Sequence, residues 1–264
     1  MADVKKQNLN PENLNNLTNF TFVLIKPYSK DNAKNEVARK LVKFQIAQAM
    51  ALENHAYAHN NNGQLLYEVI SEGEVNYNKE DIAKHYEEHY GRPYYPALEN
   101  CLSKNSTYGM IIKCNNSKFD VLKKIREKAG ATIKVDRENG TVISLPDKKS
   151  IRYRVPFMIE QNFSSQNGGF FIPENLDKKE NGRDKYTKVY NSDNNSVDIY
   201  TTAYVKSDSD NALKPTTVKL ATMGITENLI HTSDSLQSAR REAAIFLNVL
   251  ERTNKATLNK EDGR

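Results

Sequence analysis

Two short, almost wholly apolar segments place the strongest limits on how this chain can fold. Residues 20–27 (FTFVLIKP) and 108–114 (YGMIIKC) are each long enough for one strand, and their lack of alternation is typical of strands buried on both faces. A helical pattern follows each of them. From Asp31 onward apolar residues recur three or four positions apart, and residues 117–129 show the same spacing up to Gly130, a residue type that often ends helices.

Further segments extend this alternation of strands and helices. Strands are expected over residues 65–70 and 220–226, a charged surface helix over 79–89, and an amphipathic helix over 235–250. Four main strands and two long helices fit an α+β fold. The pattern therefore predicts a ferredoxin-like βαββαβ sandwich, in which helices cover a four-stranded antiparallel sheet.

The remaining segments differ in composition from this predicted core. Residues 1–20 contain six asparagines and predict a flexible arm, and residues 251–264 predict a polar, disordered tail. In residues 153–219 turn-forming residues recur at short intervals around strand-like pieces at 155–159 and 197–205. We expect a loop-rich, partly β insertion with one hairpin, which would divide a core domain into residues 21–152 and 220–250.

Composition excludes several classes of protein. The chain has 264 residues with 38 basic and 33 acidic side chains, and a net charge of +5 without a basic block favours phosphate-bearing ligands and is weak support for nucleic acid. No apolar run approaches the roughly 18 residues of a membrane span, and the first 20 residues lack the apolar stretch of a secretory signal. With only Cys101 and Cys114, a disulfide framework is excluded, and we expect a cytoplasmic protein without a membrane partner.

The segment from residue 228 to 247 (NLIHTSDSLQSARREAAIFL) contains the candidate chemistry. Glycine-rich phosphate-binding motifs are absent, so a nucleotide site would need another design. His231 follows a strand and precedes a helix that Ser233, Asp234 and Ser235 can cap. In the functional interpretation His231 is a nucleophile, Glu242 orients its ring, and Ser233 supports that contact. The alternative is a capped helix start that happens to lie beside a histidine.

Four motifs in this chain resemble those of the nucleoside diphosphate kinase family. Residues 228–235 (NLIHTSDS) match the signature N-x-I-H-G-S-D-S, except that Thr232 replaces Gly, and Arg241-Glu242 follow as in the family. Residues 21–27 (TFVLIKP) are similar to its opening strand, residues 85–96 (HYEEHYGRPYYP) to HY-x-E-H-x-x-x-P-F-F, and residues 126–132 (REKAGAT) to R-x-x-x-G-A-T. Chance agreement at four separated places in the right order is improbable.

The resemblance implies a nucleotide site with cationic phosphate ligands. It implies that Tyr86 lies beside His231 and that Lys26 and Asn228 bind the ribose. Nucleotide phosphates would be bound by Arg126, Thr132 and Arg152, with Mg²⁺ held mainly by those phosphates and few or no protein ligands. Tyr94 would stack on the base where the family commonly has Phe, which predicts broad base tolerance.

One phosphate ligand has two candidate positions. The family's second phosphate-binding arginine lies in a G-T-I-R or S-I-R context, and Ser150-Ile151-Arg152 fits the second of these. Counting onward from Thr132 without a gap instead places Ile143 at the position of the arginine. We favour Arg152 because an aliphatic side chain would leave phosphate charge uncompensated.

The resemblance implies a kinase that transfers the γ-phosphate of a nucleoside triphosphate to a nucleoside diphosphate through a phosphohistidine at His231. It also implies a homo-oligomer, although Arg152 and His231 are 79 positions apart, which far exceeds the family's spacing. Thr232 and the insertion motivate an alternative, a nucleotide-binding or partner-binding protein with weakened catalysis and a new interface. The His85 and His89 pair could suggest a metal site, but the adjoining glutamates favour an ordinary charged helix face.

Overall fold

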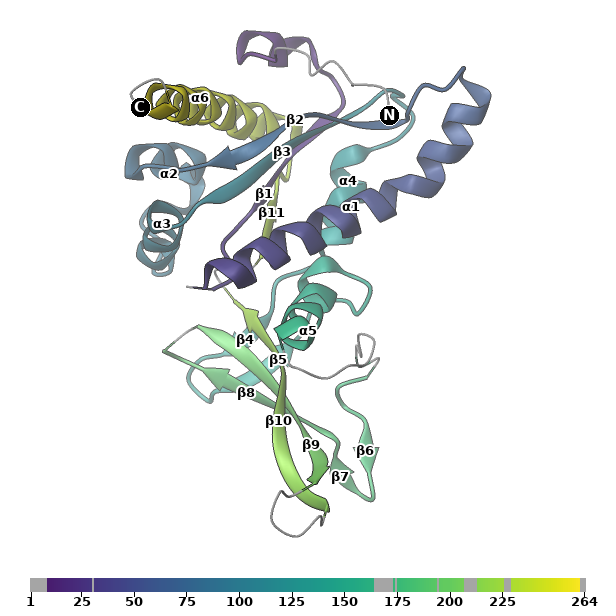
Figure 1. Ribbon diagram of the computed structural model, residues 1–264, viewed down its shortest axis with the longest axis vertical. Coiled ribbons are helices and arrows are strands. Elements are labelled where there is room, and N and C mark those ends of the chain that lie inside the picture. The colour runs from purple at the N-terminus through teal and green to yellow at the C-terminus, as the bar shows by residue number, and fades with distance from the viewer. Residues whose placement is uncertain are drawn as a thin grey trace. The chain divides into compact units, whose positions relative to one another are not determined.

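The computed structural model describes residues 9–29, 31–163, 173, 175–193, 195–206, 213–225 and 229–261 (Figure 1). The chain divides into two compact units, which we call unit 1 (Met1–Ala129 and Leu229–Arg264) and unit 2 (Gly130–Asn228). Each is described by itself. Residues 130–152, which the sequence pattern grouped with the core domain, belong to unit 2, so the second unit is larger than the expected insertion.

Unit 1 is built on a four-stranded antiparallel sheet with the order β11-β1-β3-β2. Its strands are β1 (Phe20–Ile25), β2 (Tyr67–Val75), β3 (Thr107–Cys114) and β11 (Ile230–Thr232). Helix α1 (Asn32–Asn60) connects β1 to β2, and β3 lies between these two strands in the sheet. Helix α4 (Val121–Ala129) connects β3 to unit 2 and lies before β11 in the chain. Two βαβ connections, each spanning one intervening strand, give the predicted ferredoxin-like α+β sandwich, and this prediction is confirmed.

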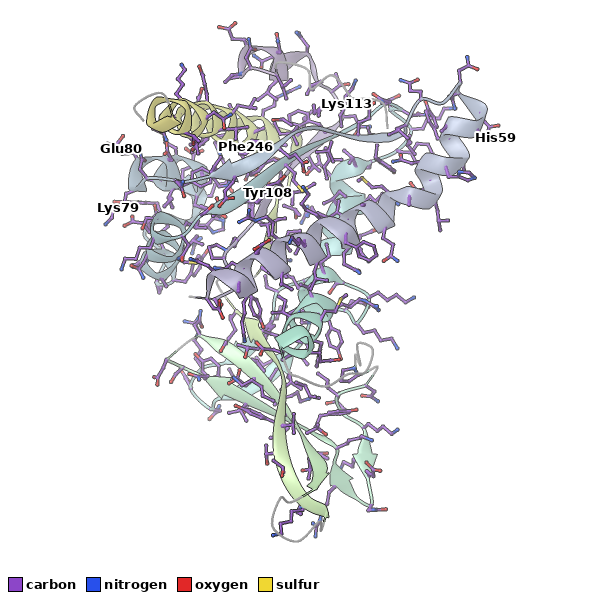
Figure 2. All side chains as sticks on the ribbon, viewed as in Figure 1. His59, Lys79, Glu80, Tyr108, Lys113 and Phe246 are labelled. Carbon is purple, nitrogen blue, oxygen red and sulfur yellow. The ribbon has the colours of Figure 1, made fainter. Side chains whose placement is uncertain are left out.

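Helices cover both faces of this sheet. Figure 1 shows α1 and α4 on one face and α2 (Lys79–His85), α3 (Tyr95–Lys104) and α6 (Leu236–Glu261) on the other. All six residues of β1 are buried, as the absence of alternation predicted. Phe22 on β1, Ile82 on α2 and Phe246 on α6 belong to one core cluster, and Figure 2 shows Phe246 on the side of α6 that faces the sheet.

The close approach of α6 to the sheet requires glycine on β3. A Cβ atom at Gly109 would lie 2.3 Å from the Phe246 ring, and one at the neighbouring Gly73 would lie 2.5 Å from a methyl group of Leu250. Because Phe246 and Leu250 are four residues apart, they occupy one face of α6. The two glycines thus let α6, which contributes Glu242 to the candidate site, lie directly on the strands.

Unit 2 contains more regular structure than the sequence indicated. Its elements are β4 (Lys134–Asp136), β5 (Thr141–Ser144), α5 (Ile151–Phe163), β6 (Lys179–Glu180), β7 (Arg183–Asp184), β8 (Tyr186–Asn191), β9 (Ser196–Lys206) and β10 (Leu213–Gly224). β9 confirms the strand expected at 197–205, and it pairs with both β8 and β10, so a three-stranded sheet replaces the single hairpin. Phe157 of α5 and Val197 of β9 belong to the core of this unit.

Several local predictions were wrong, each for an identifiable reason. The segment 155–159 is helical in α5 and not a strand, because a short apolar run has no periodicity that separates the two. Residues 220–224 end β10 in unit 2, whereas the fourth strand of the main sheet is β11; Thr226 lies outside the described residues. The tail is helical as far as Glu261, and a 3-10 helix, η1 (Glu12–Asn16), places Leu14 in the core of unit 1, so residues 9–20 are not a free arm. The charged helix expected at 79–89 ends at His85 and is followed by a short 3-10 helix, η2 (Glu87–His89).

The part of the chain that the structure describes contains no helix long and apolar enough to cross a membrane. Cys101 and Cys114 are both buried free thiols.

Candidate functional site

His231 lies on the edge strand β11, where its backbone pairs with Leu24 of β1. The pairing continues on both sides, because Lys26 N donates to Leu229 O (2.9 Å) and Ser233 N donates to Phe22 O (3.2 Å). The imidazole is 18% exposed. Backbone pairing with a buried strand therefore fixes the position of a ring that remains open on one side.

Glu242 of α6 contacts the Nε2 side of the His231 ring. Its Oε2 atom lies 3.0 Å from His231 Nε2, and Ser233 Oγ donates a hydrogen bond of 2.6 Å to the same oxygen. Glu242 and Ser233 are both buried. The His231 contact is electrostatic rather than a well-aligned hydrogen bond, because the oxygen is close but lies off the direction required for one. Glu242 thus contacts both of the residues with which it was predicted to act.

The electrostatics of this contact favour a charged carboxylate. Burial opposes ionisation of Glu242, but the nearby His231 ring and the hydrogen bond from Ser233 outweigh it and lower the pKa of Glu242. An ionised carboxylate beside Nε2 favours a proton on that ring nitrogen. The lone pair of His231 is then on Nδ1.

Tyr86 and Lys26 lie next to the imidazole. The Tyr86 ring is 5.3 Å from the His231 ring between centroids, in an edge-to-face arrangement, and Lys26 Nζ lies 5.5 Å from the centre of the Tyr86 ring. Both residues are buried. The structure therefore brings the predicted Lys26 and Tyr86 to the same place as His231.

A cavity of about 180 Å³ opens against this cluster. Its lining includes His231, Thr232, Asp234, Glu242, His85, Tyr86, Glu88, His89 and Arg241. Arg241 pairs with the carboxylates of Glu87 (2.6 Å) and Glu88 (2.9 Å) at the cavity. Thr232, at the position where the resembled signature has glycine, is one of the lining residues.

Arg126 lies on the exposed side of α4 and donates a hydrogen bond of 3.1 Å to the backbone oxygen of Asp234. Asp234 follows His231 by three residues and lines the cavity. This bond ties the guanidinium to the loop that leaves the histidine. Tyr94 is half-buried, and its hydroxyl lies 2.6 Å from His89 Nδ1.

The other predicted nucleotide ligands belong to unit 2. Thr132 is exposed and Arg152 is half-buried in unit 2, where Arg152 donates to the backbone oxygen of Gly130. Ile143, the alternative to Arg152, is 65% exposed on β5. Asn228 lies outside the described residues. Their roles as ligands stay predictions.

His85 is the residue that sequence reasoning missed. It was expected on a charged helix face, but it is only 2% exposed, and its ring lies 5.4 Å from the His231 ring. Burial lowers the pKa of His85 to about 3, so the imidazole is neutral. The signal was the three-residue spacing from Ile82, which places His85 on the same buried face of α2.

Among the described residues, one histidine and carboxylate cluster could hold a metal ion. One ligand atom from each of His85, His231 and Glu242 lies within 4.8 Å of the other two. Two imidazoles and one carboxylate do not fit Mg²⁺, which prefers six oxygen ligands in octahedral geometry. These residues therefore do not provide a protein cage for Mg²⁺.

Comparison with known proteins gives likenesses to solved structures only. No protein-family model matches the chain, and no curated protein matches it. The nucleoside diphosphate kinase of Aquifex aeolicus matches with a TM-score of 0.41 and 15% identity, covering 86% of this chain and 94% of that one. The nucleoside diphosphate kinase of Encephalitozoon cuniculi matches with a TM-score of 0.40 and 11% identity, covering 86% and 88%. At these values neither likeness bears on catalysis, which has to be judged from the residues around His231.

Proposed function

We propose that this protein is a phosphotransferase that moves the γ-phosphate of a nucleoside triphosphate to a nucleoside diphosphate through a phosphohistidine at His231. The observation that carries the proposal is the buried Glu242 carboxylate 3.0 Å from His231 Nε2, a contact that lowers the pKa of Glu242. A buried carboxylate is costly unless it is paired, so its position against a partly exposed imidazole calls for an explanation. A nucleophilic histidine provides one.

The chemistry follows from the tautomer that Glu242 favours. The Nδ1 lone pair attacks the γ-phosphorus, an N–P bond forms, and the bond from phosphorus to the bridging oxygen breaks. The nucleoside diphosphate leaves with that electron pair. The ring, still protonated on Nε2, becomes positively charged, and the carboxylate 3.0 Å away stabilises this charge. A second nucleoside diphosphate then attacks the phosphohistidine, and the reverse sequence restores the neutral ring.

The triphosphate needs cationic partners, and the neighbourhood of His231 supplies some of them. Lys26 lies beside Tyr86, and Arg126 is bound to the backbone of Asp234 in the cavity lining. In the proposed complex Arg126 binds phosphate and Lys26 binds the ribose, while the ligand roles that the resemblance implies for Thr132, Arg152 and Asn228 stay predictions. Tyr94 stacks on the base. Mg²⁺ arrives bound to the phosphate oxygens, whose charge it offsets.

Labelling with [γ-³²P]ATP tests this proposal. Wild-type protein should acquire an acid-labile, base-stable label that a nucleoside diphosphate removes, and His231→Gln should acquire none. His59→Gln is the matched control, because His59 is exposed on α1. Labelling of His231→Gln equal to that of the wild type would exclude His231 as the nucleophile.

A second candidate function has its own supporting observation. Thr232 lines the cavity beside His231 at the position where the resembled signature has glycine, so nucleotide binding with weak or no transfer is the alternative. Fluorescent-nucleotide binding without any label on the wild-type protein would favour this binding function over the enzyme.

A further inference from the structure

The buried His85 has no function in the proposed transfer and has unsatisfied polar atoms. Its ring packs against aromatic rings of Phe22, Tyr77 and Tyr86 at centroid distances of 5.5, 5.6 and 4.7 Å. Within the described part of the chain, neither of its ring nitrogens has a hydrogen-bond partner. Buried polar atoms without partners are uncommon and cost stability. A ligand that binds an imidazole nitrogen would remove this cost.

We propose that His85, His231 and Glu242 form a binding site for a divalent transition-metal ion of the zinc type. Two imidazoles and one carboxylate are a ligand set that Zn²⁺ uses with an open fourth position. The three ligand atoms lie within 4.8 Å of one another. Tetrahedral Zn²⁺ places its ligands about 3.4 Å apart, so the most distant pair would have to approach by roughly 1.4 Å.

The surroundings of the three ligands are compatible with a bound dication. Glu242 is anionic, while Lys26 and Arg241 bring positive charge near His85. Arg241 is paired with the carboxylates of Glu87 and Glu88, which offset its charge. The cavity of about 180 Å³ is lined by all three ligands and gives the ion an entry path and room for a water molecule or anion as its fourth ligand.

Ser233 supports the site from outside the ligand set. Its hydroxyl donates to Glu242 Oε2 at 2.6 Å, and such contacts fix a ligating carboxylate and commonly change metal affinity by about 10–100-fold. His231 Nε2, the nitrogen that faces Glu242, is the ligand we assign. Coordination there moves the ring proton to Nδ1, which removes the lone pair used for attack. Bound metal would therefore block phosphorylation; this consequence rests on the proposed function, whereas metal binding does not.

Titration of the full-length protein with Co²⁺, followed by displacement with Zn²⁺, tests the site directly. Wild-type protein should bind one equivalent and develop the visible absorption of four-coordinate Co²⁺, which Zn²⁺ abolishes. Zinc K-edge absorption should show two imidazoles and oxygen ligands, with zinc–nitrogen distances of about 2.0–2.1 Å. Failure of the wild type to bind, or a spectrum without two imidazoles, would overturn the proposal.

Variants then identify the ligands. His85→Gln should weaken Zn²⁺ binding at least about 100-fold, and Ser233→Ala about 10-fold. His55 and His59 are exposed on α1 at a spacing of four, so this pair could bind Zn²⁺ in place of the proposed site. Figure 2 labels His59 near the end of that helix. A His55→Gln/His59→Gln double variant should retain binding. Loss of the ion in the double variant, or unchanged affinity in His85→Gln, would refute the assignment.

Discussion

Glu242→Gln is the most informative single change, because it removes a charge while preserving shape. In the proposed phosphohistidine the ring carries a positive charge, and the structure places its Nε2 atom 3.0 Å from the Glu242 carboxylate. At an effective dielectric constant of about 20, unit charges at this distance attract by roughly 5 kcal/mol. His231 is partly exposed, and the glutamine dipole recovers part of the attraction, so we expect a loss of about 3–4 kcal/mol. This corresponds to a transfer rate about 10²–10³-fold lower.

Single-turnover quench-flow measurement of ³²P transfer to His231 tests this expectation apart from product release. Glu251→Gln is the matched control, since Glu251 lies on the same helix and is exposed, with only a surface pair to Lys255. Circular dichroism establishes that both variants are folded. If Glu242→Gln transfers phosphate within threefold of the wild-type rate, the carboxylate does not stabilise the charged ring and the reasoning is refuted.

Three other predictions follow from named contacts. Gly109→Ala should lower the free energy of unfolding in urea by about 1–3 kcal/mol, because the added methyl meets the Phe246 ring at 2.3 Å; Phe246→Leu in the same chain should recover part of the loss, and additive losses would contradict this. Arg126→Ala should slow transfer roughly 10²–10³-fold, while Lys123→Ala on the same helix should leave the rate unchanged; normal turnover in Arg126→Ala would exclude its role. His85 should make the protein acid-sensitive. Below about pH 6.5 this imidazole binds a proton in the unfolded chain, whereas the native ring stays neutral down to about pH 3. The free energy of unfolding therefore decreases as pH falls through this window, by up to ~1.4 kcal/mol per pH unit. Urea titrations from pH 7 to 4 should show a smaller fall in His85→Phe than in the wild type.

The two central strands of the main sheet, β1 and β3, could be predicted because they are largely buried on both faces. Continuous apolar runs identified β1 and β3, and the helical spacing after each run located α1 and α4. By contrast, β11 has only three residues, and it forms a strand because its backbone pairs with β1. Such a strand depends on a tertiary partner, and a local sequence pattern does not contain that information.

The two ends of unit 1 show that a polar composition is weak evidence of disorder. Residues 251–261 continue α6, because extending an existing helix costs little once it is nucleated, and Glu251 and Lys255 form an i, i+4 pair on its surface. At the other end, Leu14 is fully buried among asparagines. One or two apolar side chains that reach a core can order a segment whose average composition indicates the opposite.

His85 and His231 show why the site was only partly predictable. The contacts of Glu242 with His231 and Ser233 arise within a single strand–helix segment, so the spacing along the chain already indicated them. His85 reaches the same ring from α2, 146 residues earlier in the sequence, and two glutamates follow it at positions 87 and 88. Its burial results from packing α2 and α6 on one face of the sheet, where Phe22 and Phe246 occupy the same core. A local charge pattern describes only the exposed side of such a helix. The burial of a histidine on the opposite side is therefore predicted wrongly, even when the fold is predicted correctly.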